Sequence, residues 1–315
     1  MNEFKLGTYI KKRREELKMR QEELCEGLCA VSSLSRIENN QQDPSRNLTK
    51  NLLERLGLPR EKFTAFWQQK DITIGSLMRE INNDASLCRQ APREERPLIQ
   101  AQIREKLEEL EEITAPEDKS ARQFLLAQKA LLGDADGPYS FEKKLEMQME
   151  AIRLTCPGFD PEDFRQGHYS ENEALLIHQI ANTYSADGQK TRAIDMDRQL
   201  LWYIEKHYKE LAGYASMFCL VAQNYAIRLG TLKRFTDAIE IAEKGRDVCI
   251  RYDEYQFLPG FLAVQAECNF FLGKEEESKA LYLRAYYIYD AYADRINREI
   301  MRREMRERLG LEPEY

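Results

Sequence analysis

The clearest chemical pattern in the sequence is a group of hydrogen-bonding side chains near the N-terminus. Ser32, Ser33 and Arg36 are three and four residues apart, so a helix would place them on one face. Hydroxyl and guanidinium groups bind polar partners through directed hydrogen bonds. The chain contains no phosphate-binding loop, dinucleotide fingerprint, nucleophile elbow or zinc-protease motif. The pattern therefore favours binding over catalysis, and we expect neither enzyme activity nor a cofactor.

Residue types that hold metals or build disulfides are sparse. Only three histidines occur, so a His-based metal cluster is poorly supported, and the seven cysteines include no C-x-x-C pair. Scattered cysteines are typical of small apolar side chains in a reducing compartment. No run of 18 apolar residues predicts a membrane span, and the charged start has no apolar run of signal-peptide length. We expect a cytoplasmic protein with no membrane contact.

Charge is distributed unevenly along the 315 residues. Residues 1–70 hold 14 Lys and Arg against 10 Asp and Glu, a net charge of +4. The remaining residues carry −11, within a total of −7. A small basic head on a large acidic body is consistent with a nucleic-acid-binding module joined to a module with another task. The low counts of Gly and Pro, 15 and 10, predict long helices with short connections.

The first seventy residues predict short helices with tight joints. One helix is expected over 21–28 and another over 32–39, with Ser32 as its N-cap and a brief turn between them. Two short helices separated by such a turn form a helix-turn-helix, the unit that places a helix in the DNA major groove.

Two strings in this segment carry a family resemblance. Gln21-Glu22-Glu23-Leu24, followed by Leu34-Ser35-Arg36-Ile37-Glu38-Asn39, makes residues 4–60 similar to the lambda-repressor-like, XRE-type DNA-binding domain. The turn is one residue shorter than usual and lacks Gly, which resembles the PlcR/Rgg-type subgroup. The resemblance implies that the third helix reads bases and that an ion pair joins Arg14 to Glu38. The expected DNA-binding residues are Gln21, Ser32, Ser33, Arg36, Asn39 and Asn40.

Roles within this set follow from position. Arg36 is the expected base reader, because a guanidinium pairs bidentately with guanine, a contact worth roughly 1–3 kcal/mol of discrimination. Gln21, Asn39 and Asn40 are expected at phosphates. The alternatives are that Ser32 only caps its helix, that Arg36 is a solvated charge and that Gln21 is plain surface.

The acidic body predicts paired amphipathic helices without strands. Residues 61–89 form the expected connector, with Phe63, Phe66 and Trp67 packing the head to the body or to a partner. The helices are expected at 61–69, 72–89, 94–113, 118–132, 141–155, 171–187, 190–207, 211–229, 234–251, 257–272, 275–291 and 293–309.

A repeat is visible in these pairs. Gly188, Gly230 and Gly273 are 42 and 43 residues apart, each expected at a tight turn between two helices, with alanines in the helices that follow. This resembles tetratricopeptide repeats over about 115–291, with longer helices than usual. The resemblance implies a concave face lined by the first helix of each pair. Counting back from each Gly gives the expected peptide-binding residues His178, Asn182, Ser185, Asn224, Ile227, Glu267 and Phe270.

Asn amides can hold the backbone of an extended peptide whatever its side chains, and Glu267 could accept a peptide amine. The alternative is that Asn182 and Asn224 are solvated or bond between helices, and that the aromatic residues only pack the core.

Head and body together resemble the peptide-sensing PlcR/Rgg-type regulators, over nearly the whole chain. The expected fold is all-α, with a lambda-repressor-like helix-turn-helix domain at 1–68 followed by a right-handed α-solenoid of tetratricopeptide-like pairs. Residues 69–115 are expected to form the connector and the first helices of the solenoid, and 116–315 the repeat domain with a C-terminal capping helix. The resemblance implies a transcription factor that binds a double-stranded DNA operator as a homodimer and responds to a short signalling peptide. The alternatives are a protein-interaction scaffold, or a mobile-element repressor whose body only dimerises.

Overall fold

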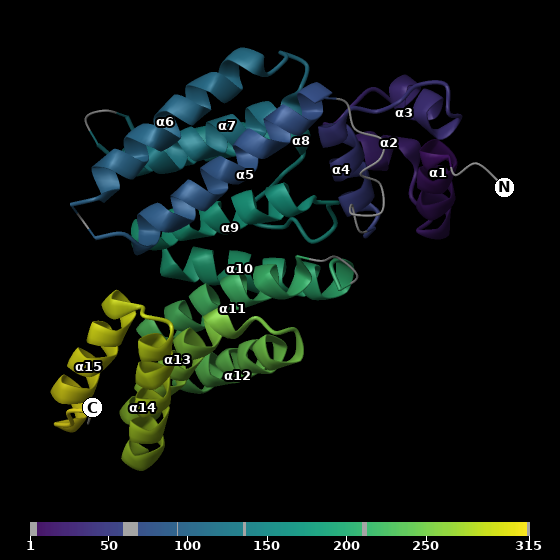
Figure 1. The fold of residues 1–315 in the computed structure, drawn as a ribbon. Coiled ribbons are helices and arrows are strands. Elements are labelled where there is room, and N and C mark those ends of the chain that lie inside the picture. Colours follow the sequence, from purple (N-terminus) through teal and green to yellow (C-terminus); the bar gives the residue numbers. More distant parts are fainter. Residues whose placement is uncertain (1–4, 59–68, 93, 135–136, 210–212, 314–315) are drawn as a thin grey trace. The chain divides into compact units, whose positions relative to one another are not determined.

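The computed structural model describes residues 5–58, 69–92, 94–134, 137–209 and 213–313 (Figure 1). Within these ranges the chain is helical, with no strand and one isolated backbone bridge between Asp134 and Gly137. The all-α prediction is confirmed. Across the same ranges, no helix has the length and apolar character needed to span a lipid bilayer.

The helices follow the predicted positions closely, and three of them match to the residue. They are α1 Leu6–Glu16, α2 Gln21–Cys25, α3 Val31–Glu38, α4 Arg46–Arg55, α5 Gln69–Gln90, α6 Arg96–Ile113, α7 Lys119–Leu132, α8 Phe141–Thr155, α9 Glu171–Ala186, α10 Lys190–His207, α11 Tyr214–Thr231, α12 Phe235–Arg251, the 3-10 helix η2 Tyr255–Phe257, α13 Leu258–Phe271, α14 Glu275–Ala291 and α15 Arg295–Leu309. Most of the helix expected at 61–69, with Phe63, Phe66 and Trp67, lies outside the described residues.

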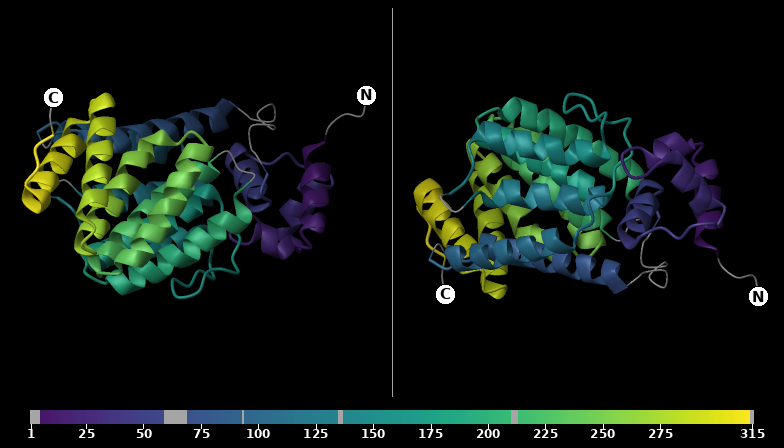
Figure 2. Two further views of the ribbon diagram at one scale, coloured as in Figure 1. Left: turned by 90° about the horizontal axis from the view of Figure 1, so that it is seen from below. Right: turned by 90° about the horizontal axis from the view of Figure 1, so that it is seen from above.

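Two compact units divide the chain, Met1–Thr183 and Tyr184–Tyr315, with the division inside α9. The first unit holds the four-helix head and the helices α5 to α8, in which α5 packs on α6 and α7 packs on α8 (Figure 2). In the second unit, neighbouring helices from α10 to α15 pack in sequence. Paired packing of consecutive helices is the arrangement that the repeat pattern predicts.

The head is built around a small apolar core. Leu24, Leu34 and Ile37 are essentially inaccessible to solvent, and residues of α1 and α4 close the same cluster. Two details differ from the prediction. α2 ends at Cys25 because Glu26 leaves the helical region with ψ 125° and Gly27 then takes a left-handed conformation at φ +69°, and α3 begins at Val31 with Ala30 at the N-cap position. Ser32 therefore lies inside the first turn of α3, and its predicted role as N-cap is wrong.

The turns between paired helices share one backbone conformation. Gly188 and Gly273 have positive φ angles, as predicted, and the next residue donates its N–H to the carbonyl five positions back. This is the arrangement that ends helices with a left-handed residue. Gly230 is different because it lies within α11, and Lys233 takes the left-handed position at φ +60°. The predicted turn role of Gly230 is wrong, and the register of that repeat moves by three residues.

Candidate functional site

Helix α3 presents one polar face to solvent while its apolar residues anchor the head. Leu34 and Ile37 are at most 1% exposed, whereas Val31, Ser32 and Arg36 are exposed and Ser33 is half-buried. No described residue accepts a hydrogen bond from the Arg36 guanidinium, which is exposed and available to a ligand. The structure thus places Ser32, Ser33 and Arg36 on one accessible face, as the spacing predicts.

A buried ion pair fixes the orientation of α3. The Arg14 guanidinium donates to both oxygens of Glu38, at 2.6 and 2.9 Å, which confirms the predicted pair between α1 and α3. Arg14 also donates to the backbone oxygen of Met19 at 2.9 Å. The contact with Glu38 raises the pKa of Arg14, against the effect of burial. The side-chain amide of Gln21 donates to Glu38 at 2.6 Å, so a phosphate contact from Gln21 would come from its backbone N–H.

The two asparagines that follow α3 support the local fold. Asn40 has φ +56°, accepts the backbone N–H of Gly7 at 3.1 Å and donates to the Thr8 hydroxyl at 2.8 Å. Asn39 is exposed, and its amide donates to the backbone oxygen of Ser35 at 2.9 Å. Asn40 therefore ties the end of α3 to the start of α1. Phosphate contacts by either residue stay a prediction.

We expect Glu38→Ala to lower the free energy of unfolding by about 3 kcal/mol, because it leaves the largely buried Arg14 charge without its carboxylate. Urea titration of the full-length protein would measure the change. Glu16→Ala is the matched control, since Glu16 makes an exposed ion pair with Arg13. Equal losses for both variants would contradict the role of Glu38.

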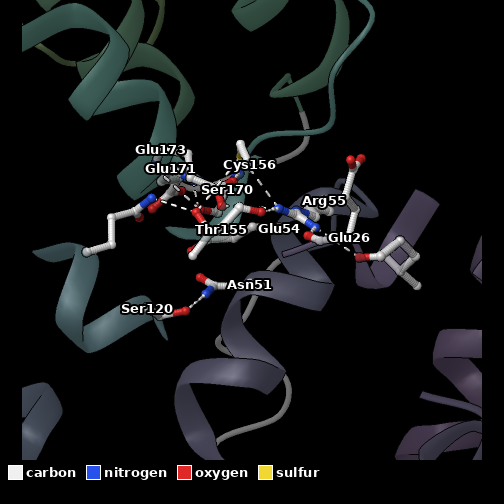
Figure 3. Close-up of polar contacts among 12 residues, drawn as sticks. Glu26, Asn51, Glu54, Arg55, Ser120, Thr155, Cys156, Ser170, Glu171 and Glu173 are labelled. Atoms are coloured by element: carbon white, nitrogen blue, oxygen red, sulfur yellow. Dashed lines mark hydrogen bonds and ion pairs between the residues drawn. The ribbon is translucent and has the colours of Figure 1, made fainter. Parts of the chain in front are cut away.

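A second cluster of polar contacts joins the head to the helices that follow it in the first unit (Figure 3). Its centre is Arg55 at the end of α4, which is 6% exposed. The guanidinium donates to the backbone oxygens of Leu24 at 3.1 Å, Glu26 at 2.7 Å and Thr155 at 3.2 Å, and to the Glu173 carboxylate at 3.1 Å. Since the Glu173 side chain is fully buried, this is a desolvated ion pair.

Further contacts surround Arg55 along α4. The carboxylate of Glu54 accepts the backbone N–H of Glu171 at 2.8 Å, and Asn51 donates to the Ser120 hydroxyl (Figure 3). Gly27 packs so closely on the backbone of Thr155 that a Cβ there would lie 1.6 Å from the carbonyl oxygen. Only glycine fits this contact. Close packing is therefore a second reason, besides the left-handed backbone, for a glycine at position 27. We call this cluster the α4 junction. It comprises Arg55 and Glu173 with Leu24, Glu26, Thr155, Glu54, Glu171, Asn51, Ser120 and Gly27.

Sequence reasoning missed the α4 junction. The available signal is local: Glu54 and Arg55 are two charges inside the apolar run Leu52-Leu53-Glu54-Arg55-Leu56, whose leucines are fully buried. Charges embedded in a buried helix must have partners. Nothing in the helical spacing identifies Glu173, which lies 118 residues away.

A cavity of about 290 Å³ lies beside the α4 junction and contains His168 on its wall. Burial lowers the pKa of His168 below its ordinary value, and the nearby charge of Arg55 acts in the same direction, whereas Glu23 and Glu26 act in the opposite one. The folded protein therefore takes up a proton at His168 less readily than the unfolded chain.

We expect the free energy of unfolding to fall as the pH is lowered from 7.5 to 5.5. The folded-state pKa of His168 lies below its unfolded value near 6.5, so the contribution of His168 is complete above that pH and declines below it. Urea titrations at several pH values would show a shallower decline for His168→Gln. Identical pH slopes for the two proteins would contradict this assignment.

The residues predicted to bind a peptide lie in different surroundings. In the first unit, His178 is buried and Asn182 is half-buried on α9. In the second unit, Ser185 and Phe270 are half-buried and Ile227 is 45% exposed. Contacts between these residues and a peptide stay a prediction.

In the second unit, Glu267 and Phe270 meet at one side chain from α15. Arg308 donates to Glu267 at 2.7 Å, and its guanidinium carbon lies 5.8 Å from the ring centre of Phe270. Arg308 was not predicted, and any peptide amine at Glu267 would compete with it.

Asn224 falls outside the column that it was assigned to. Its amide donates to the backbone oxygen of Leu220 at 3.0 Å. When the repeats are aligned on their left-handed residues, Gly188, Lys233 and Gly273, the column six residues earlier is Asn182, Ile227 and Glu267. The assignment of Asn224 rested on Gly230, and the observed turn replaces it with Ile227.

A helix-turn-helix head with an accessible third helix, followed by sequential helix pairs, defines the architecture of a DNA-binding module joined to a repeat module. The helix-turn-helix family model matches residues 10–63. A comparison with curated proteins finds no match.

Solved structures match over nearly the whole chain. PlcR of Bacillus thuringiensis, in complex with the peptide PapR7 and DNA, is 21% identical with a TM-score of 0.61, covering 94% of this chain and 98% of that one. The SHP pheromone receptor Rgg2 of Streptococcus dysgalactiae is 12% identical, with a TM-score of 0.51 and coverage of 97% and 100%. The apo competence regulator ComR of Streptococcus vestibularis is 16% identical, with a TM-score of 0.51 and coverage of 97% and 98%. The chain has the fold of these three proteins.

Proposed function

We propose that this protein is a cytoplasmic transcriptional regulator that binds a DNA operator as a homodimer and senses a short peptide through its repeat domain. The observation that carries the proposal is the exposed face of α3, with Ser32, Ser33 and Arg36 accessible while Leu34 and Ile37 hold the helix in the head. A helix presented in this way can enter the major groove with its polar residues toward the bases.

The protein acts as a binding switch and has no catalytic role in this proposal. In this proposal residues 1–68 bind DNA, 69–115 form the connector and the first helices of the solenoid, and 116–315 form the repeat domain with its C-terminal capping helix. PlcR, which shares the fold, was solved with a peptide and DNA together. A dimer is favoured because one small head buries little surface, and linking two heads on one site multiplies their affinity.

Salt-dependent DNA binding tests the proposal. Full-length protein is titrated into a fluorescent duplex of random sequence while the salt concentration is raised. We expect log affinity to fall linearly with log salt concentration, because lysines and arginines of the head displace counterions from phosphates. Lys12→Ala, an exposed change on α1, should reduce the slope by about one unit. No detectable binding at low salt would contradict the proposal.

A further inference from the structure

Two cysteines of the second unit lie in direct contact. The Sγ atoms of Cys219 on α11 and Cys249 on α12 are 3.5 Å apart, and both residues are fully buried free thiols. The seven cysteines look scattered in the sequence, and 30 residues separate these two along the chain. The packing of α11 on α12 therefore creates a pair of sulfurs that the sequence does not show. We call Cys219 and Cys249 the thiol pair.

Small residues bring the two helices together at this point. Gly245 of α12 lies one turn before Cys249, and its backbone oxygen is 3.9 Å from the sulfur of Cys219. Ala242, a further turn back, is fully buried. Gly245 has no room for a side chain, because a Cβ there would lie 2.2 Å from the ring of Phe261 on α13. Backbones packed this closely hold the two sulfurs next to each other in the folded protein.

The contact also makes the two thiols unequal. The hydrogen bond between them lowers the pKa of Cys249 and raises the pKa of Cys219, whereas burial raises both. The thiolate is the reactive form of cysteine, so Cys249 is the thiol expected to react first. Cys219 then lies within contact distance of the product. Oxidant-sensitive cysteines are often placed beside such a resolving thiol.

Access to Cys249 comes from the end of α12. Cys249 is two residues from Arg251, the last residue of that helix, and its neighbours Ile250 and Tyr252 are 54% and 44% exposed. Helix ends open locally at a lower free energy than the core of a domain. A small, uncharged oxidant can therefore reach the sulfur through a transient opening of the last turn, without unfolding of the whole unit.

We propose that the thiol pair is a redox-sensitive modification site, at which hydrogen peroxide oxidises Cys219 and Cys249 to a reversible disulfide between α11 and α12. First, the Cys249 thiolate attacks one peroxide oxygen. The O–O bond breaks, an S–O bond forms, and the leaving hydroxide takes up the proton that Cys249 lost. Second, the Cys219 sulfur attacks the sulfenic sulfur, so that an S–S bond replaces the S–O bond and hydroxide leaves as water with the Cys219 proton. In total the two sulfurs lose two electrons, and one peroxide becomes two waters.

Bond formation needs only a small movement. The sulfurs of a disulfide are about 2.05 Å apart, so those of the thiol pair must approach by about 1.5 Å. In a reducing compartment disulfides are usually transient, which fits a pair that is reduced at rest and closes on oxidation. The bond would link α11, which carries Ile227, covalently to α12, and the two helices of this repeat could no longer shift against each other.

Peptide mapping of the oxidised protein tests the proposal. Reduced full-length protein is treated with hydrogen peroxide, denatured in iodoacetamide to block the remaining thiols, and digested with trypsin. Cys219 and Cys249 are then in separate peptides, 210–228 and 247–251, neither of which has another cysteine. Cys268→Ala is the matched control, because Cys268 is a buried cysteine of the neighbouring α13. Circular dichroism verifies that this variant and Cys219→Ala are folded.

Wild type and Cys268→Ala should yield the two peptides joined and two hydrogens lighter than their sum. This link should exceed any other cysteine pair by about fivefold or more, because groups held in contact react at a high effective concentration. Dithiothreitol should reverse the link, and Cys219→Ala should leave Cys249 as a sulfenic acid that dimedone captures. Cys219 and Cys249 recovered as alkylated thiols after peroxide, or linked to a third cysteine, would overturn the proposal. The map of the wild type decides this even if Cys219→Ala does not fold.

Discussion

Arg55→Ala is expected to lower the free energy of unfolding by about 3–5 kcal/mol, one of the largest effects of any single substitution in this chain. The change removes the hydrogen bonds of the guanidinium to four oxygen acceptors and leaves the fully buried Glu173 carboxylate without its positive partner. Breaking a buried pair on one side costs this much because the remaining charge stays desolvated. Urea titration of the full-length protein, followed by circular dichroism, measures the loss.

Two variants separate the ion pair from its surroundings. Arg55→Lys should recover little of the stability that Arg55→Ala loses, because one ammonium group cannot bond all the acceptors that the planar guanidinium reaches. Arg20→Ala is the matched control, since Arg20 pairs with Glu23 on an exposed surface and should change stability little. A double variant, Arg55→Met with Glu173→Gln, should lose less free energy of unfolding than the two single variants lose together. Additive losses would show that the two residues do not act together.

Arg36→Ala is expected to abolish the preference for the selected operator while retaining salt-sensitive binding to other DNA. The guanidinium is exposed on the accessible face of α3, and its loss should cost roughly 1–3 kcal/mol of base discrimination. Gel-shift titrations would compare the operator with a scrambled duplex of the same composition, with the fold checked by circular dichroism.

Arg79→Ala supplies the control for this substitution. Arg79 is exposed on α5, outside the helix-turn-helix, so removing its charge should leave the ratio of operator to scrambled affinity unchanged. Should Arg36→Ala also leave that ratio unchanged, Arg36 is not the base reader and the assignment of α3 fails.

The helices were predictable because their signal is local. Apolar spacing of three and four residues, with Gly or Pro at the joints, marks α8, α10 and α14 to the residue. The misplaced turn after α11 arises because a residue other than the expected glycine takes the left-handed conformation. Lys233 takes that conformation in place of Gly230, and the sequence carries no sign of it because a lysine at positive φ is uncommon.

The candidate sites also differ in whether a local sequence signal identifies them. The polar face of α3 and the pair of Arg14 with Glu38 depend on a short motif, and the structure confirms the pair. The α4 junction combines residues from helices far apart in the chain, such as Arg55 with Glu173. Such contacts depend on how helices pack, which the spacing of residues along one helix does not determine.

The most direct test is to sequence the duplexes that the purified full-length protein selects from a random DNA pool, with and without candidate signalling peptides. We predict a motif of two symmetric half-sites, spaced by about 10 base pairs or a multiple of it, whose recovery changes when peptide is present. Recovery of no sequence above the starting pool, in either condition, would contradict the claim that this protein is a peptide-responsive, sequence-specific DNA-binding regulator.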